Sequence, residues 1–186
     1  MSQAFAYLSV LLSIVLGLEI AEILQAWAGL LRGRARVRFY LPPIIWSAIF
    51  LLLIVQFWWV SFGLASRADW NFASFCTVFG QTVAIYVASA LVLPQSEGDH
   101  QVDLRAHYYR EVPPLFGLGL VFSAIGFVKD WLLHERLVPL RLGVSFLFII
   151  LMVVLLAVRK PRVHEAAAPI VAVLMIGYFV VLFWRI

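Results

Sequence analysis

The sequence predicts an all-α, polytopic integral membrane protein with six transmembrane helices. Three observations lead to this prediction. Hydrophobic residues make up 64% of the 186 residues and charged residues only 13%, the apolar residues form long uninterrupted runs, and the charges cluster between those runs. Soluble domains are about 45–50% apolar and about 25% charged, so a soluble fold of this size could not bury so much apolar surface. We expect a single transmembrane domain over residues 1–186.

Six runs are long enough, or nearly so, for a helix to cross a membrane, which takes about 20 residues. They cover residues 5–31, 39–65, 72–93, 115–133, 137–158 and 166–184. The runs are continuous, whereas a β-barrel strand would alternate polar and apolar residues, so we expect helices. Prolines stand near the start of four runs, where the first helical turn needs no N–H donor. These prolines are Pro42, Pro43, Pro113, Pro114, Pro139 and Pro169.

The ends and the middle of the chain add three expectations. The first run is expected to be a retained helix and not a cleaved signal peptide, because no cation precedes it and Glu19 and Glu22 interrupt it. The longest connection, residues 94–114, is polar enough to form an element of its own. Three spans fall in each half of the chain, so a duplicated unit would be an inverted 3+3 repeat.

The single cysteine, Cys76, excludes an internal disulfide.

The cations predict how the helices are oriented. Six alternating spans place the loops after the first, third and fifth spans on one side, and most cations lie in these loops. They are Arg32, Arg34, Arg36, Arg38, Arg105, Arg110, Arg159, Lys160 and Arg162. Positive charge gathers in cytoplasmic loops, so we expect both termini on the non-cytoplasmic side. The excess of Arg over Lys favours a bacterial inner membrane.

Four polar residues within the spans are candidates for an ion path. Glu19 and Glu22 lie three residues apart and share one helical face, and an acidic side chain inside a span is costly unless it is paired or hydrated. Gln56 and Gln81, in the second and third spans, could line the same path. Alternatively, Glu22 reaches the interface and pairs with a loop arginine, and the glutamines only hydrogen-bond to neighbouring helices.

The third loop carries a candidate metal site. Asp103, His107 and Glu111 fall at positions i, i+4 and i+8 of a predicted loop helix, so one face would present three groups suited to a divalent metal. The same residues could instead form a surface helix with Arg105 and Arg110 as counter-ions. All four histidines fall in loops or at span ends, which argues against a haem held between helices.

Tryptophans mark the predicted outer ends of the second and third spans. Trp58, Trp59 and Trp70 lie where interfacial tryptophans anchor helices in the headgroup layer. The same cluster could bind a lipid or another flat apolar ligand.

Several functions remain open. The first is a small channel or transporter that moves a proton, a cation or a cationic solute through Glu19 and Glu22. The second is a non-transporting membrane subunit that binds a partner protein or a lipid. A third is an intramembrane enzyme that acts on a lipid, although no phosphate-loop, nucleophile or zinc-protease motif is present, so the sequence leans against an enzyme and indicates no cofactor. Membrane lipids are the expected partners, a homo-oligomer is an open alternative, and the scattered cations argue against nucleic acid.

Overall fold

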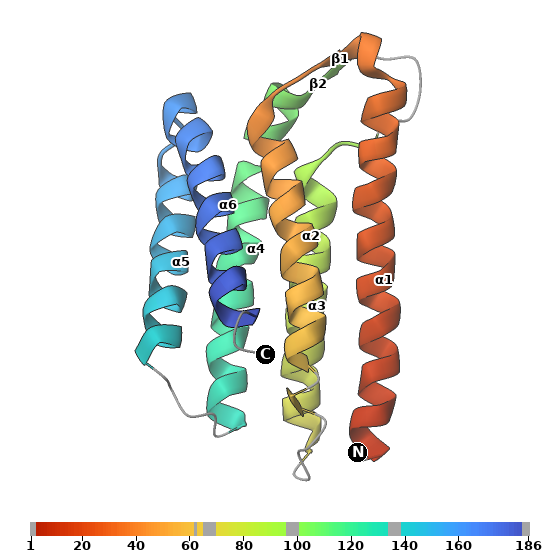
Figure 1. Ribbon diagram of the computed structural model, residues 1–186, viewed down its shortest axis with the longest axis vertical. Coiled ribbons are helices and arrows are strands. Elements are labelled where there is room, and N and C mark those ends of the chain that lie inside the picture. Colours follow the sequence, from red (N-terminus) through yellow and green to blue (C-terminus); the bar gives the residue numbers. More distant parts are fainter. Residues whose placement is uncertain (1–2, 62, 65–69, 96–100, 134–138, 184–186) are drawn as a thin grey trace.

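The protein is a bundle of six α-helices with a short two-stranded sheet at one end. The computed structural model describes residues 3–61, 63–64, 70–95, 101–133 and 139–183. The helices are α1 (Gln3–Arg32), α2 (Leu41–Ser61), α3 (Phe72–Val92), α4 (Leu104–Leu132), α5 (Pro139–Ala157) and α6 (Pro161–Phe183). They run up and down along the long axis of the molecule (Figure 1), which confirms the predicted all-α class.

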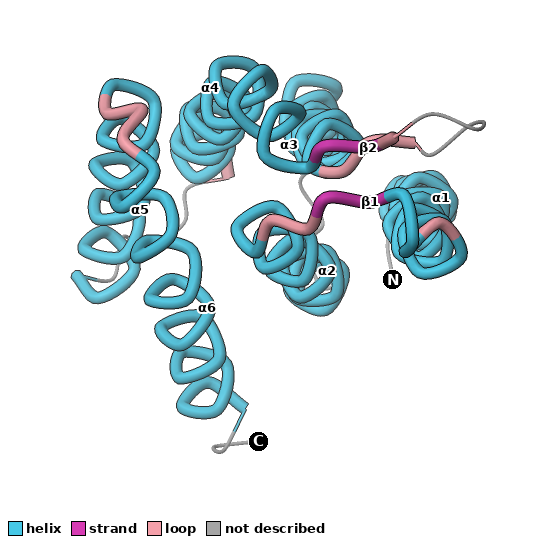
Figure 2. The backbone as a smooth tube through the Cα atoms, turned by 90° about the horizontal axis from the view of Figure 1, so that it is seen from above, coloured by secondary structure: helices cyan, strands magenta, loops and turns pink. Residues whose placement is uncertain are grey.

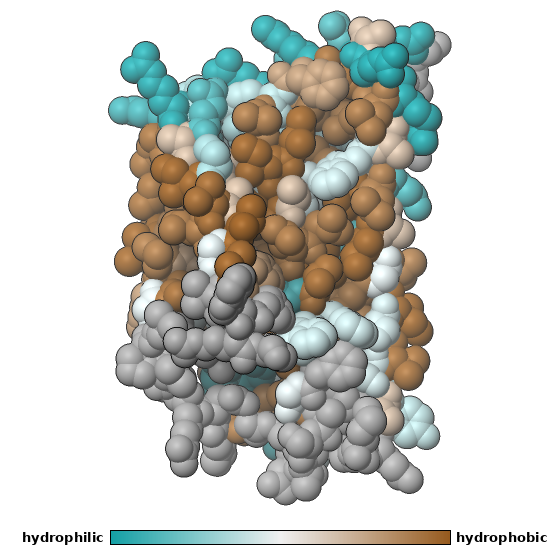
Figure 3. Space-filling model, in the orientation of Figure 1, coloured by the Kyte–Doolittle hydropathy of each residue, from teal (hydrophilic) through white to brown (hydrophobic). Residues whose placement is uncertain are grey.

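Five of these helices are long and apolar enough to cross a membrane, namely α1, α2, α3, α4 and α6. Apolar side chains cover most of the coloured part of the visible face between the sheet end and the grey atoms (Figure 3), as is expected of helices that contact lipid. The chain is therefore a multi-pass membrane protein. Helix α5 has 19 residues and is about 28 Å long. Its apolar segment, Leu142–Ala157, is shorter than those of the other five helices. The sixth span stays a prediction.

Helix α3 lies at the centre of the packing. It contacts α1, α2 and most extensively α4, while α2 also packs against α6, and α4 against α5. Seen along the bundle, α1, α2, α3 and α4 form a compact group, and α5 and α6 flank it on one side (Figure 2). The second half of the chain does not reproduce the helix contacts of the first, so these contacts give the predicted inverted repeat no support.

Two short strands join loops that are far apart in the sequence. Strand β1 (Val37–Arg38) follows a 3-10 turn, η1 (Arg34–Arg36), and strand β2 (Val102–Asp103) directly precedes α4. The strands are parallel, with Val37 opposite Val102 and Arg38 opposite Asp103. We call the end of the bundle that carries this pair the sheet end. The N-terminus lies at the opposite end (Figure 1).

Helix α4 begins much earlier than the sequence predicted. It starts at Leu104 and not at residue 115, so that much of the predicted loop 94–114 is helical, and Pro113 and Pro114 lie inside the helix. Asp103 caps it, because its Oδ1 accepts hydrogen bonds from the N–H groups of Arg105 at 2.9 Å and Ala106 at 3.0 Å. The two prolines lack an N–H group, so they cannot bond to the carbonyls four residues earlier, and these carbonyls belong to the part of α4 nearest the sheet end.

Two other helix boundaries also differ from the prediction. Helix α6 begins at Pro161 and not at residue 166, so Pro169 lies inside the helix, whereas Pro161 takes the first-turn position that prolines favour. Helix α2 ends at Ser61, whereas the predicted span continued to residue 65, which lies outside the described residues. Helix α3 matches its predicted span to within one residue. Asn71 caps it by accepting a hydrogen bond from the N–H of Ser74 at 2.8 Å.

The sheet end is strongly cationic. All nine cations of the first, third and fifth loops are exposed there, and hydrophilic side chains gather at this end in Figure 3. They are Arg32, Arg34, Arg36, Arg38, Arg105, Arg110, Arg159, Lys160 and Arg162. The chain thus places these loops together, as the count of spans predicted.

Acid should weaken the sheet end through Asp103. The hydrogen bonds from Ala106 and Arg105 and the nearby Arg38 guanidinium, 3.4 Å away, hold the pKa of this carboxyl below its usual range. A lowered pKa stabilises the fold above the unfolded-state value of about 4, and that stability is lost as the pH falls through the folded-state value. Asp103→Asn keeps the cap but not the charge. We expect wild type to be the more stable form at pH 7 and the difference to vanish in acid, as measured by thermal unfolding in detergent. A difference independent of pH would contradict this assignment.

Candidate functional site

Glu19 lies in the middle of the buried face of α1. From Leu8 to Ile23 the buried residues of this helix recur every three or four positions, and Glu19 stands where the pattern favours an apolar side chain. The buried residues are Leu8, Leu12, Leu16, Glu19, Ile23 and Leu30. The Glu19 side chain is 0% exposed, and neither of its carboxylate oxygens has a hydrogen-bond partner. An unpartnered carboxyl at this depth is costly, and the ionised form most of all.

Helix α3 presents a hydroxyl group to this carboxyl. Ser89 is buried and lies beside Glu19. Its hydroxyl donates a hydrogen bond to the carbonyl oxygen of Tyr86 at 2.9 Å. A serine hydroxyl has a single hydrogen, so in this arrangement Ser89 cannot also donate to Glu19.

No cation of the neighbouring helices can neutralise Glu19. Helices α2 and α3 contain no Lys, Arg, His, Asp or Glu, and the one cation of α1 is Arg32, at the sheet end of the helix. The distance from Glu19 to Arg32 along α1 is 13 residues, or about 20 Å. A charge on Glu19 therefore has no counter-ion within the three helices that form this part of the bundle.

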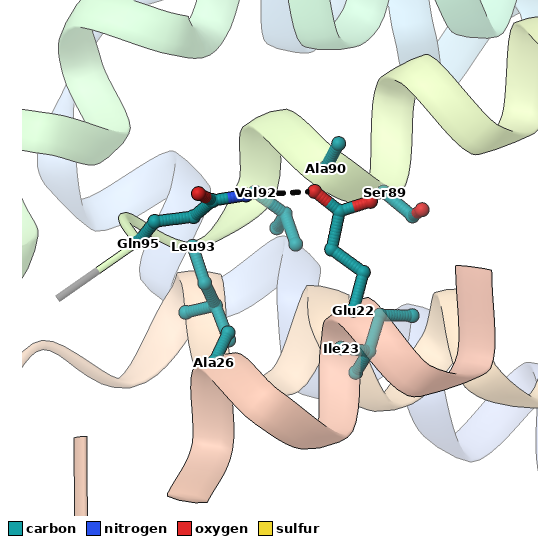
Figure 4. Close-up of a pocket in the computed structure, with 8 residues that line it drawn as sticks. All are labelled: Glu22, Ile23, Ala26, Ser89, Ala90, Val92, Leu93 and Gln95. Carbon is teal, nitrogen blue, oxygen red and sulfur yellow. Dashed lines mark hydrogen bonds between the residues drawn. The ribbon is translucent and has the colours of Figure 1, made fainter. Parts of the chain in front are cut away.

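Glu22 lies one turn closer to the sheet end and faces a small cavity between α1 and α3 (Figure 4). Its Oε1 accepts a hydrogen bond from Nε2 of Gln95 at 3.0 Å, whereas its Oε2 is buried without a partner. Tyr86 lies beside it. Water-sized molecules can reach about 10 Å³ of this cavity, roughly the room for one water. Ser89 also lines the cavity, so this residue lies near Glu22 as well as beside Glu19.

The two predicted glutamines do not join this cavity. Gln81 is buried eight residues before Ser89 on α3, and its Nε2 donates to the carbonyl oxygen of Phe122 on α4 at 3.3 Å. Gly126 makes room for it, because a Cβ there would lie 2.9 Å from Gln81 Nε2. Gln81 therefore links α3 to α4, as the alternative interpretation expected. Gln56 is half-buried on α2.

The predicted metal ligands are held apart by other contacts. Asp103 caps α4, while His107 donates from Nε2 to the carbonyl oxygen of Leu91 at 3.0 Å. Arg110 lies between the other two groups: it donates to Nδ1 of His107 at 3.2 Å and to Oε1 of Glu111 at 2.8 Å. Within the described residues, no group of three His, Cys, Asp or Glu side chains is arranged to hold a metal ion.

A buried histidine at the sheet end was not foreseen from the sequence. His164 is 0% exposed, in the second turn of α6. Its Nε2 lies 3.0 Å from the carbonyl oxygen of Val158, and its Nδ1 lies 2.9 Å from the Tyr108 hydroxyl. A carbonyl only accepts, so Nε2 carries the hydrogen and the neutral ring accepts from Tyr108. His107 likewise lies in a helix, and His100 and His134 lie outside the described residues. The pattern of polar residues in the sequence does not indicate that His164 contacts Tyr108, 56 residues earlier in the chain.

The predicted tryptophan anchors lie toward the end opposite the sheet. Trp58 and Trp59 are 41% and 48% exposed on α2, and Trp70 is half-buried just before α3. The Trp58 indole donates to the Ser13 hydroxyl at 3.3 Å, beside an apolar groove between α1 and α2. This placement agrees with anchoring at an interface and leaves lipid binding untested.

The fold and the site together define a multi-pass helical membrane protein whose first helix carries a buried carboxyl, Glu19, and a half-buried one, Glu22. Comparison with known proteins gives no closer assignment: no family model matches the chain, and no curated protein or solved structure is significantly similar to it.

Proposed function

We propose that the protein is a membrane transporter that binds a proton or a small cation at Glu19 and Glu22. The observation that carries the proposal is the Glu19 carboxyl, which is fully buried with both oxygens unpartnered. Replacing it by an apolar residue would remove the cost of burying it, so a structural role alone does not account for it. A proton or a cation from outside the bundle would neutralise it.

The packing around the pair favours an occluded carrier site over an open pore. A pore needs a continuous hydrated path, whereas the cavity beside Glu22 holds about one water. Around Glu19 the buried neighbours on α1 are leucine and isoleucine. Transport through such a site requires the helices to alternate between arrangements that open it to each side.

We also propose that the sheet end faces the cytoplasm. Its nine exposed cations support this orientation. The cavity beside Glu22 would then lie on the cytoplasmic side of Glu19, and the N-terminus would lie on the other side of the membrane.

Flux through reconstituted protein tests the proposal. Purified protein in liposomes should carry protons or a monovalent cation, followed with a luminal pH dye and with tracer sodium or potassium. Glu19→Gln should abolish this flux, because the amide has nearly the same size but cannot bind a proton or neutralise a cation. Glu165→Gln is the matched control, since it removes a carboxyl that is exposed on α6, and it should leave the flux unchanged. Wild-type protein that carries neither protons nor cations, or flux that survives Glu19→Gln, would refute the proposal.

A further inference from the structure

The geometry points to a proton as the cation, taken up from the sheet end through Glu22 and Ser89 and held on Glu19; this inference rests on the proposed function. The carboxylate pair alone does not distinguish a proton from another cation, nor does it define the path of entry. Three features carry it: the supply of oxygen ligands, the size of the cavity and the position of the Ser89 hydroxyl.

The side chains beside the site are too few to bind a hard divalent metal cation. Hard cations such as magnesium and calcium take six or more oxygens. Apart from the two carboxyl groups, the polar side chains beside the site are Ser89, Tyr86 and Gln95. Of these, Gln95 already donates to Glu22, and the Ser89 hydroxyl points to a backbone carbonyl. The described residues offer no third acidic or imidazole ligand. A proton needs one oxygen only.

The cavity is also too small for an organic cation. Its accessible space of about 10 Å³ corresponds to one water. Ile23, Val92 and Leu93 line it beside three polar side chains, as Figure 4 shows. A single water is enough to deliver a proton. Gln95 acts as a positioning residue, because it occupies Oε1 of Glu22 and leaves Oε2 as the oxygen without a partner.

Ser89 completes the path between the two carboxyls. A hydronium ion in the cavity gives its proton to Oε2 of Glu22 and leaves as a neutral water. Ser89 Oγ then takes this proton while its own hydroxyl proton passes to an oxygen of Glu19, so Glu22 becomes a carboxylate again and Glu19 becomes neutral. For this step the hydroxyl turns away from the Tyr86 carbonyl. That carbonyl keeps a partner, since within a helix it accepts from the N–H group four residues later.

Few other ionisable groups face this path. Glu22 and Tyr86 are the ionisable neighbours of Glu19 on α1 and α3. Helix α2, which also packs against α1, has no ionisable side chain. Within α1, α2 and α3, no cation lies beside Glu19.

The test compares proton flux with metal-ion flux in the same liposomes. With the membrane potential clamped, wild-type protein should acidify the lumen down a pH gradient in the absence of sodium, and tracer sodium should not enter. Sodium flux without proton flux would overturn this inference and leave the transporter proposal standing. Absence of both fluxes would overturn the two together.

Substitutions at Ser89 distinguish a proton relay through its hydroxyl from a structural role of this side chain. Ser89→Ala should slow proton flux by roughly tenfold, as a barrier raised by one lost hydrogen-bonding step implies, and Ser89→Thr should restore it because it keeps the hydroxyl. Ser123→Ala is the matched control, because Ser123 also donates to a carbonyl of its own helix, at 2.9 Å from Gly119 on α4, and it should leave the flux unchanged. Equal rates for Ser89→Ala and Ser123→Ala would remove Ser89 from the path.

A spectroscopic measurement keeps the inference testable if a variant transports poorly for other reasons. Infrared spectra of wild-type protein at neutral pH should contain the carbonyl stretch of a protonated carboxylic acid, and Glu19→Gln should lack it. Glu165→Gln should retain it. If the band is absent from wild type, or persists in Glu19→Gln, Glu19 does not hold the proton.

Discussion

Replacing His164 by alanine is expected to lower the free energy of unfolding by about 3–5 kcal/mol, the range for removing a large buried ring. The ring is fully buried and joins three helices: it belongs to α6, accepts from Tyr108 of α4 and donates to the Val158 carbonyl just after α5. Its loss leaves a cavity and two unsatisfied polar groups, each of which adds to the cost. Chemical or thermal unfolding in detergent micelles, followed by circular dichroism, measures the change.

The neighbouring residue provides the control for His164. Glu165 is exposed, so Glu165→Ala should change the stability by less than about 0.5 kcal/mol, as is usual for surface positions. If His164→Ala were no more destabilising than Glu165→Ala, the contact between the three helices would not contribute to the stability of the fold.

The second large effect has the opposite sign. Glu19→Met should raise the free energy of unfolding by about 1–3 kcal/mol, because it replaces a buried carboxyl without partners by an apolar side chain of similar length. The same substitution should abolish transport. Glu19 would then lower the stability of the fold and be required for transport. Such a trade-off between stability and activity is common at functional sites.

Glu22 serves as the comparison for this prediction. Glu22→Met also removes a carboxyl of α1, but it breaks the hydrogen bond from Gln95, so its gain in stability should be smaller. Both variants are measured by the same unfolding experiment. If Glu19→Met were less stable than wild type, the carboxyl would have a structural partner, and the proposed site would lose its main support.

Hydropathy predicted most of the helices because lipid contact imposes long apolar runs, and α1 and α3 match their predicted spans closely. It failed at the start of α4 because the first turns of that helix carry charged side chains and stand at the sheet end. Asp103 is a residue type that favours the start of a helix, whereas Pro113 and Pro114 favour a start of α4 near residue 115. In the structure they lie within it.

The candidate site could be predicted only in part. Glu19 and Glu22 were recognisable because carboxyls are rare in apolar runs, and their spacing placed them on one face. Their neighbours Ser89 and Gln95 lie about 70 residues away in the chain, and the register between α1 and α3 decides that they meet. The pairing of His164 with Tyr108 depends on the packing of α6 and α4 in the same way. No local pattern encodes such a register.

The pairing of β1 with β2 has a consequence for how the chain is assembled. Val37 and Arg38 cannot find Val102 and Asp103 until the ribosome has released α2, α3 and the segment after them. The strand pair therefore forms only after α3 has been synthesised, and it then joins the ends of α1 and α3. The side chains of α3 that lie beside Glu19 and Glu22 are also absent until then, so the costly burial of Glu19 against α3 cannot precede the synthesis of α3.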